Sequence, residues 1–183
     1  MNMNHFKVGL RPYQADDAPL LYEAASESIA DIYPWMSWCH PGYTLAESEE
    51  WVPICLADRA AKHAFDFVIH DQDTGKFLGA VGINQIHSLH QFANLGYWVR
   101  SSCMGHGIAV TATRMCARFG FDDLGLKRIE IVAAVGNRRS QRVAEKVGAT
   151  REGILRNRLK IGEVWHDAVM FSLVPDDLKA ALV

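Results

Sequence analysis

The stretch that decides the fold is YWVRSSCMGHGIA, residues 97–109, which joins a strand to a helix. The residues before it form an apolar and aromatic run that is typical of a strand. After it, apolar residues recur at intervals of four, three and four from Ile108 to Phe119, which predicts one buried face of a helix. Gly105 and Gly107 lie at the joint, where the chain must turn.

A turn of this kind favours an anionic ligand. The first N–H groups of a helix have no partner inside it, the positive end of the helix dipole lies there, and glycine lets phosphate oxygens approach closely. A plain glycine turn is the alternative. Two better-known phosphate loops do not fit: Gly75-Lys76 is followed by Phe77, and the third residue after Gly107 is Val110.

Before this turn, the sequence predicts a strand over residues 6–11, a helix over 16–30, a structured loop over 31–43, a helix over 44–61, and strands over 65–70, 76–86 and 92–99. The second helix has a clear start, because Thr44 and Glu47 have the spacing of a capping box. Pro53 marks an irregularity inside it. The three strands that follow are joined by hairpin turns, so we expect an antiparallel meander.

After the turn and its helix, the sequence predicts a strand over residues 128–135, a helix over 137–147 and strands over 151–161 and 164–173. Strand, helix, strand and helix in succession indicate a crossover connection. The sum is a mixed α/β fold with about seven strands. No linker or repeat divides the chain, so we expect a single domain over residues 1–183.

Composition restricts the partners. Among 183 residues, 19 Lys and Arg against 21 Asp and Glu give a net charge of −2, whereas proteins that bind nucleic acid through phosphate contacts are usually basic. Four cysteines without CxxC spacing fit a reducing compartment. With no leader-like or membrane-spanning apolar run, we expect a soluble, cytoplasmic protein with no nucleic-acid or membrane partner.

Three segments together resemble one family. The run from Met104 to Ala109 resembles motif A of the GNAT superfamily of acetyl-CoA-dependent N-acetyltransferases, with Met104 in place of the usual Gln or Arg. Residues 94–99, NLGYWV, are similar to the "GYW" strand of the RimJ/RimL branch. Residues 137–148 resemble that branch's N-x-x-S-x-x-x-x-E-K-x-G signature.

The resemblance implies the GNAT acyl-CoA N-acyltransferase fold, with a mostly antiparallel sheet whose fourth and fifth strands splay apart. It also implies acetyl-CoA as co-substrate and no metal. Trp98 and Val99 would contact pantetheine, and Asn137 would hold the cofactor. The pyrophosphate would bind the N–H groups of Met104, Gly105, His106, Gly107, Ile108 and Ala109.

The resemblance further implies that Ser140 is the general acid that protonates the departing thiolate. Taken as residues alone, Asn137 and Ser140 equally suit a helix N-cap and its first turn. Asn94 and Leu159 occupy positions where related enzymes often carry a glutamate. The candidates for a general base are therefore an ordered water relay or one of four side chains: His40, Glu47, Glu49 and Glu50.

Two further groups of residues allow alternatives. Trp35 and Trp38 lie in a loop that borders the acceptor pocket in RimL-like proteins, although core packing explains two such tryptophans equally well. His87, His90 and His166 with Asp167 could be drawn as a metal site, but their spacing matches no known zinc motif, so we expect no metal.

The expected activity is acetyl transfer from acetyl-CoA to a primary amine in a ternary complex. The RimL-like resemblance implies that the acceptor is the N-terminal amine of a protein. Two alternatives stay open: a small amine such as an amino sugar, polyamine or antibiotic, and a sensor module that binds acyl-CoA without turnover. The sequence also leaves open whether the protein forms a homodimer.

Overall fold

The computed structural model describes residues 6–179 and builds them around one seven-stranded sheet. The strands are β1 (Val8–Pro12), β2 (Phe65–Asp71), β3 (Phe77–His87), β4 (Phe92–Val99), β5 (Arg128–Ala134), β6 (Thr150–Ile161) and β7 (Val164–Leu173). They lie in the order β1-β2-β3-β4-β5-β7-β6, and every neighbouring pair is antiparallel except β4 and β5. The mixed, mostly antiparallel sheet predicted from the sequence is confirmed.

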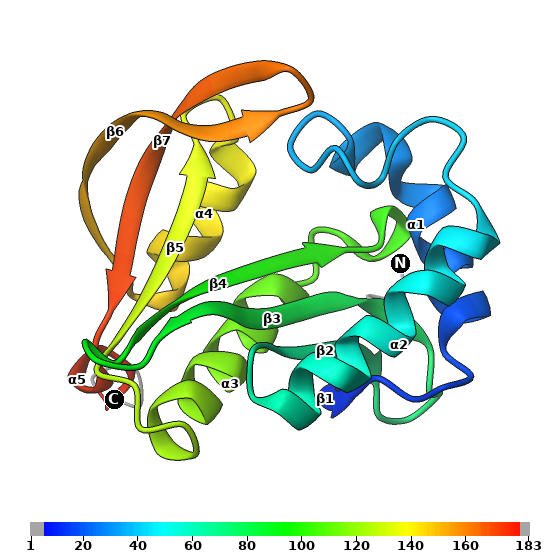
Figure 1. Cartoon of the computed structure of the whole chain (residues 1–183), viewed down its shortest axis with the longest axis horizontal. Coiled ribbons are helices and arrows are strands. Elements are labelled where there is room, and N and C mark those ends of the chain that lie inside the picture. Colours follow the sequence, from blue (N-terminus) through cyan, green and yellow to red (C-terminus); the bar gives the residue numbers. More distant parts are fainter. Residues whose placement is uncertain (1–5, 180–183) are drawn as a thin grey trace.

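Helices cover both faces of this sheet. They are α1 (Ala18–Ile32), α2 (Leu45–Ala61), the short 3-10 helix η1 (Ser101–Cys103), α3 (Ile108–Asp122), α4 (Arg138–Val147) and α5 (Pro175–Lys179). α1 and α2 pack on β2 and β3 from one side, while α3 crosses β1, β3 and β4 on the other (Figure 1). No helix within residues 6–179 is both long and apolar enough to cross a membrane.

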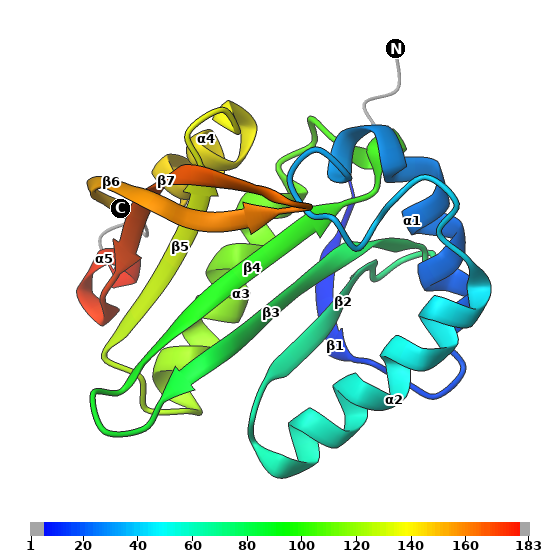
Figure 2. The same ribbon diagram turned by 45° about the horizontal axis from the view of Figure 1, so that its top comes forward.

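The two central strands, β4 and β5, are paired at one end of the sheet and diverge beyond it. β4 pairs with β5 only from Phe92 to Asn94, although β4 stays paired with β3 as far as Val99. β5 meanwhile remains paired with β7 up to Ala134. Each strand follows its own outer neighbour, so a V-shaped gap opens between them, which confirms the predicted splay (Figures 1 and 2).

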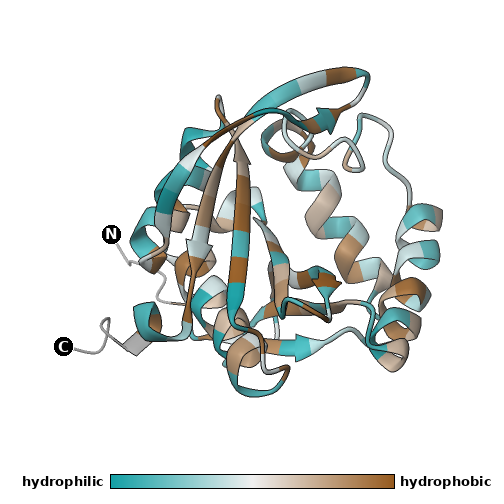
Figure 3. Cartoon of the chain, turned by 60° about the vertical axis from the view of Figure 1, so that its left-hand side comes forward, coloured by the Kyte–Doolittle hydropathy of each residue, from teal (hydrophilic) through white to brown (hydrophobic). Residues whose placement is uncertain are grey.

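The larger core lies between the sheet and α3. Ile108, Ala112 and Cys116 are buried along the helix face that meets the strands, whereas Met115, expected on that face, is only half-buried. Gly120 is needed at the closest approach, because a Cβ there would lie 2.8 Å from Ile129 and from Ile83. Figure 3 shows hydrophobic residues gathered along the strands and on the helix sides that meet them.

The aromatic loop after α1 is well packed. Cys39 is fully buried, and its Sγ donates to the carbonyl oxygen of Ala25 at 3.4 Å. The Thr44–Glu47 capping box predicted for α2 is present, and the helix continues through Pro53. The loop therefore stands as a fixed wall beside the open end of the gap, opposite the turn between β6 and β7 (Figures 1 and 2).

Candidate functional site

The turn between β4 and α3 carries the positive end of a helix without a side-chain cap. Gly105 and Gly107 have φ values of +83° and +75°, and Gly107 is the N-cap of α3. Within residues 6–179, the backbone N–H groups of residues 105–110 donate to no protein acceptor. A row of free donors at a helix start is a binding site for an anion.

Two residues of this turn differ in detail from the sequence expectation. The N–H of Met104 already donates to the carbonyl oxygen of Ser101 at 3.2 Å, so Met104 offers its side chain rather than its N–H. The ring of His106 turns away, with Nδ1 2.8 Å from the Met104 carbonyl oxygen and its edge against Phe6. Only the backbone of His106 therefore remains available at the turn.

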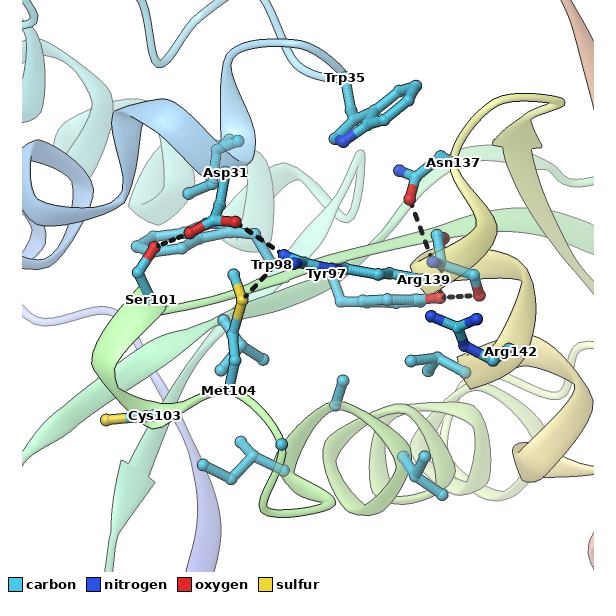
Figure 4. Close-up of a pocket in the computed structure, with 18 of the residues that line it drawn as sticks. Asp31, Trp35, Tyr97, Trp98, Ser101, Cys103, Met104, Asn137, Arg139 and Arg142 are labelled. Atoms are coloured by element: carbon cyan, nitrogen blue, oxygen red, sulfur yellow. Dashed lines mark hydrogen bonds and ion pairs between the residues drawn. The ribbon is translucent and has the colours of Figure 1, made fainter.

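The start of α4 faces this turn across the gap. Asn137 caps the helix, with its Oδ1 accepting from the N–H of Ser140 at 3.1 Å. The hydroxyl of Tyr97 donates to the carbonyl oxygen of Ser140 at 3.0 Å and lies 2.9 Å from its Oγ (Figure 4). Burial raises the pKa of Tyr97 to about 12, although its hydrogen bond to Ser140 opposes that rise. Tyr97 and Ser140 thus form a neutral hydroxyl pair that spans the gap.

The gap, the turn and α4 together enclose a cavity of about 680 Å³, which we call the first cavity. It is lined by most of the residues predicted for acyl-CoA: Trp98, Val99, Met104, Gly105, Gly107, Ile108, Ala109, Asn137 and Ser140. Trp35 lines it too, with its ring where a Cβ added at Gly136, between β5 and α4, would make contact, and so belongs to the first cavity rather than to a separate pocket.

Three cations of α4 also line the first cavity: Arg139, Arg142 and Lys146. Their spacing of three and four residues places them on one helix face. The same spacing is visible in the sequence and would have predicted a cationic helix face, but the family resemblance assigned roles only to Asn137 and Ser140 in this segment. The cations add positive charge to the free N–H groups of the α3 turn.

The carboxylate of Asp31 links two elements that line the first cavity. Asp31 at the end of α1 accepts from Ser101 Oγ at 2.7 Å and pairs with Arg139 at 2.7 Å (Figure 4). The hydrogen bond from Ser101, and then that from Arg139, lowers the pKa of Asp31. The end of α1, η1 and α4 therefore meet at one polar contact.

A second cavity, of about 430 Å³, lies on the side of the sheet covered by α1 and α2. It shares Met36, Tyr97 and Trp98 with the first, so the two cavities meet at β4. Trp38 lines the second cavity, with its ring centroid 5.7 Å from that of Trp98 and 5.6 Å from that of Tyr43. The two tryptophans of the loop therefore line different cavities, Trp35 the first and Trp38 the second.

Two of the four candidate bases line the second cavity. His40 Nε2 lies 2.8 Å from Glu47 Oε1. The carbonyl of Pro41 and the carboxylate of Glu47 raise the pKa of His40, while Thr44 and His40 lower that of Glu47. Glu49 and Glu50 are exposed on α2 and do not line this cavity.

Sequence reasoning missed Asp66, which also lines the second cavity. Its carboxylate leans over Gly82 on β3, where an added Cβ would overlap Oδ1. Among the residues that the structure describes, nothing donates a hydrogen bond to this carboxylate or pairs with it as an ion. Burial, and then the charge of Asp58, raises the pKa of Asp66 to about 6, against the opposing charge of Arg59.

The histidines weighed as metal ligands do not gather into a site. His87 stacks on His90 with ring centroids 4.7 Å apart, and His166 lies in the β6–β7 hairpin opposite Leu159. Within residues 6–179, no group of three or more His, Cys, Asp or Glu side chains is arranged to hold a metal ion.

Comparison with known proteins gives consistent matches. Residues 7–150 match the family model described as an acetyltransferase (GNAT) domain. The Probable N-acetyltransferase YjcK of Bacillus subtilis (strain 168) is 36% identical over 115 residues, covering 62% of this chain and 64% of that protein. The Ribosomal-protein-serine acetyltransferase of Escherichia coli (strain K12) is 27% identical over 110 residues, 60% of each chain.

Alignments to the first three curated relatives span 55%, 64% and 64% of their lengths. The match to solved structures is more extensive. RimJ of Mycobacterium smegmatis, in complex with CoA-disulfide, is 28% identical and superposes with a TM-score of 0.83. That alignment covers 95% of this chain and 88% of the other.

Proposed function

This chain belongs to the GNAT family of acetyltransferases, and from that membership we propose that it transfers the acetyl group of acetyl-CoA to a primary amine. The observation that carries the proposal is the joining of two cavities at β4. One is lined by free N–H groups and cations, and the other contains carboxylates. A polyanionic donor fits the first cavity and a cationic amine fits the second.

The first cavity suits the phosphates and pantetheine of CoA. The N–H groups of residues 105–110 would bind the pyrophosphate together with Arg142 and Lys146. Trp98 and Val99 lie in the part of β4 that β5 leaves unpaired, where the amides of pantetheine can pair with the strand as an added segment would. The thioester would then lie near Tyr97, where the two cavities meet.

The reaction needs a neutral amine, a polarised thioester and a proton for the leaving thiolate. The amine nitrogen attacks the thioester carbon, the C–N bond forms and the C–S bond breaks. Ser140 Oγ–H, held by Tyr97, would give its proton to the thiolate sulfur and regain one from the nitrogen of the new amide through solvent. Burial raises the pKa of Tyr97 still further above neutral pH, so this hydroxyl pair is uncharged at pH 7.

For the acceptor, we propose the N-terminal amine of a protein. The Escherichia coli relative named Ribosomal-protein-serine acetyltransferase supports this class. The second cavity supports it as well, because Trp38 and Tyr43 can enclose a short extended peptide end, while Glu47 and Asp66 favour its positive charge.

The test is release of free thiol from acetyl-CoA in the presence of defined acceptors. Peptides beginning with Ser, Ala or Met are compared with spermidine and glucosamine, and N-acetylated copies of the peptides serve as blanks. We expect turnover with a free peptide amine and none with its acetylated copy. Turnover only with the small amines would overturn the peptide class, and CoA binding without turnover on any acceptor would overturn the activity.

A further inference from the structure

We propose that Asp66 is the catalytic carboxylate that receives the acceptor's ammonium group and removes its proton before the amine attacks the thioester. The inference rests on the proposed acetyl transfer and adds a group that no local motif of the sequence indicates. It begins with a row of three positions that run side by side across the sheet: Asp66 on β2, Gly82 on β3 and Gly96 on β4.

The two glycines clear a path from this carboxylate to the centre of the site. Asp66 Oδ1 occupies the place where a side chain at Gly82 would begin, so the carboxylate already reaches one strand toward β4. Directly opposed Cα atoms of antiparallel strands are about 4.5–5.5 Å apart. An amine seated over Gly96 would therefore lie within about one strand spacing of Asp66 Oδ1.

Gly96 is where space for that amine exists. A Cβ added at Gly96 would meet no atom within 4 Å, and Gly96 lines the second cavity beside Tyr97 and Trp98. Gly96 also lies just beyond Asn94, where β4 stops pairing with β5 and the gap for the thioester opens. The nitrogen over Gly96 thus faces the carboxylate on one side and the thioester on the other.

The carboxylate of Asp66 is unusual because it is half-buried and has no hydrogen-bond or ion-pair partner among the described residues. A half-buried carboxylate normally has a cation or hydrogen-bond donors, yet Asp66 has none to its side chain within residues 6–179. The guanidinium of Arg59 donates to the backbone oxygen of Asp66 and lies over the ring of Phe67 instead. A carboxylate left open to a cavity in this way is a candidate for binding or proton transfer.

The charges that face Asp66 are few. Helix α2 presents Asp58, Arg59 and the Cys55 thiol, and the segment before α1 presents Tyr13, while the Cys116 thiol of α3 acts on Asp66 from the opposite side of the sheet. Burial raises the pKa of both thiols and of the phenol, so these three groups are neutral near pH 7. Only Asp58 and Arg59 therefore act on Asp66 as full charges, and they oppose one another.

The proton balance is complete without another reactant. Asp66 carboxylate takes one proton from the ammonium and leaves a neutral amine, whose lone pair forms the C–N bond. After the amide product departs, protonated Asp66 releases its proton to solvent. Because its pKa is about 6, the carboxylate is ionised and ready to accept a proton at neutral pH.

The test compares Asp66→Asn with Asp58→Asn in acetyl transfer across pH 5 to 9. Asp66→Asn is expected to lower kcat/KM by about 10²- to 10⁴-fold and to abolish the fall in rate on the acid side near pH 6. Asp58→Asn keeps activity but moves that fall to lower pH, because one negative charge near Asp66 is gone. An unchanged acid limb in Asp66→Asn would overturn the proposal while leaving the acetyl transfer itself intact.

Position is tested by Gly96→Ala, for which the structure has room. The added methyl group would occupy the place of the amine, so KM for the acceptor should rise while CoA affinity stays within about twofold. A normal acceptor KM in this variant would place the amine elsewhere and overturn the proposal.

A measurement independent of turnover separates failure of this proposal from failure of the proposed function. The side-chain carboxyl carbon of Asp66 is followed by NMR in the CoA-bound protein while a peptide with a free N-terminal serine is added. Its resonance should shift with that peptide and stay in place with the N-acetylated peptide. No shift with either, or an equal shift with both, would overturn the role of Asp66 even if the wild type transfers acetyl groups to no acceptor.

Discussion

At the scale of single residues, the pair of hydroxyl groups on Tyr97 and Ser140 is the most informative contact. The N-cap interpretation of Asn137 and the cofactor interpretation are compatible, since its Oδ1 accepts from Ser140 N–H while the residue lines the first cavity. The cap fixes the first turn of α4. That turn in turn holds Ser140 Oγ 2.9 Å from the Tyr97 hydroxyl.

Replacing Ser140 tests its role as general acid. Ser140→Ala should lower kcat by about 10²-fold because the thiolate loses its proton donor, while the Kd for CoA changes little. Steady-state kinetics and calorimetric titration with CoA measure the two quantities. Ser102→Ala, a serine of η1 that does not line the cavity, is the matched control. A large loss of CoA affinity in Ser140→Ala would make this residue a cofactor contact only.

The sequence predicted which residues lie together within one element, whereas the grouping of residues from different strands depends on register and was not predicted. Ser140 and Asn137 belong to one helix start, so their spacing in the sequence already places them together. Asp66 is different, because its proposed role depends on Gly82 and Gly96, which lie beside it on two other strands. Aligning the three predicted meander strands by register would have brought Asp66, Gly82 and Gly96 into one row.

At the scale of elements, α3 and α4 place two helix starts on opposite sides of one gap. The capping box of α2 and the glycine turn before α3 were predictable because each is encoded within a few residues. The burial of Cys116 instead of Met115 was not, because the face a helix buries depends on how it crosses the sheet.

The cations of α4 give the prediction for this scale. Arg142→Gln should weaken CoA binding about 5-fold, equivalent to about 1 kcal/mol, and the loss should shrink at high salt because exposed charges are screened. Titration calorimetry at 50 mM and 500 mM salt, taken as roughly low and high screening, measures both effects. Arg138→Gln, from the same helix but outside the first cavity, should bind CoA as the wild type does. Equal losses in the two variants would mean that the net charge of the helix matters and not the position of Arg142.

At the scale of the whole molecule, the sheet is two halves joined by three residue pairs. The pairing of β4 and β5 from Phe92 to Asn94 is the hinge of the V, and its open part is unpaired strand edge. The order of elements predicted this arrangement through the family resemblance. The shape of the cavities could not be predicted, since it depends on where the aromatic loop packs.

Filling the gap should protect its edges from solvent. On adding CoA, we expect slower amide hydrogen exchange in residues 95–99 and 105–110. The N–H groups of β4 that point away from β3 and the free N–H groups of residues 105–110 gain partners. β2, Phe65–Asp71, is paired on both sides and should exchange at an unchanged rate. Exchange measured by mass spectrometry decides this. Protection spread evenly over all strands would indicate general stabilisation rather than binding in the gap.

The two cavities are lined by largely different residues, and this separation has an evolutionary consequence. Helix α1, the loop after it and β4 contribute to both cavities. The first cavity also draws on η1, α3 and α4, whereas the second draws on β2, β3 and the start of α2. Of the residues that the structure describes, only Met36, Tyr97 and Trp98 line both. A lineage can therefore alter the residues of the second cavity one substitution at a time without disturbing the turn that we propose as the phosphate site. Under the proposed function, descendants of such a chain would keep the same acetyl donor while their acceptor changes, and the three shared side chains would limit how far the second cavity can change.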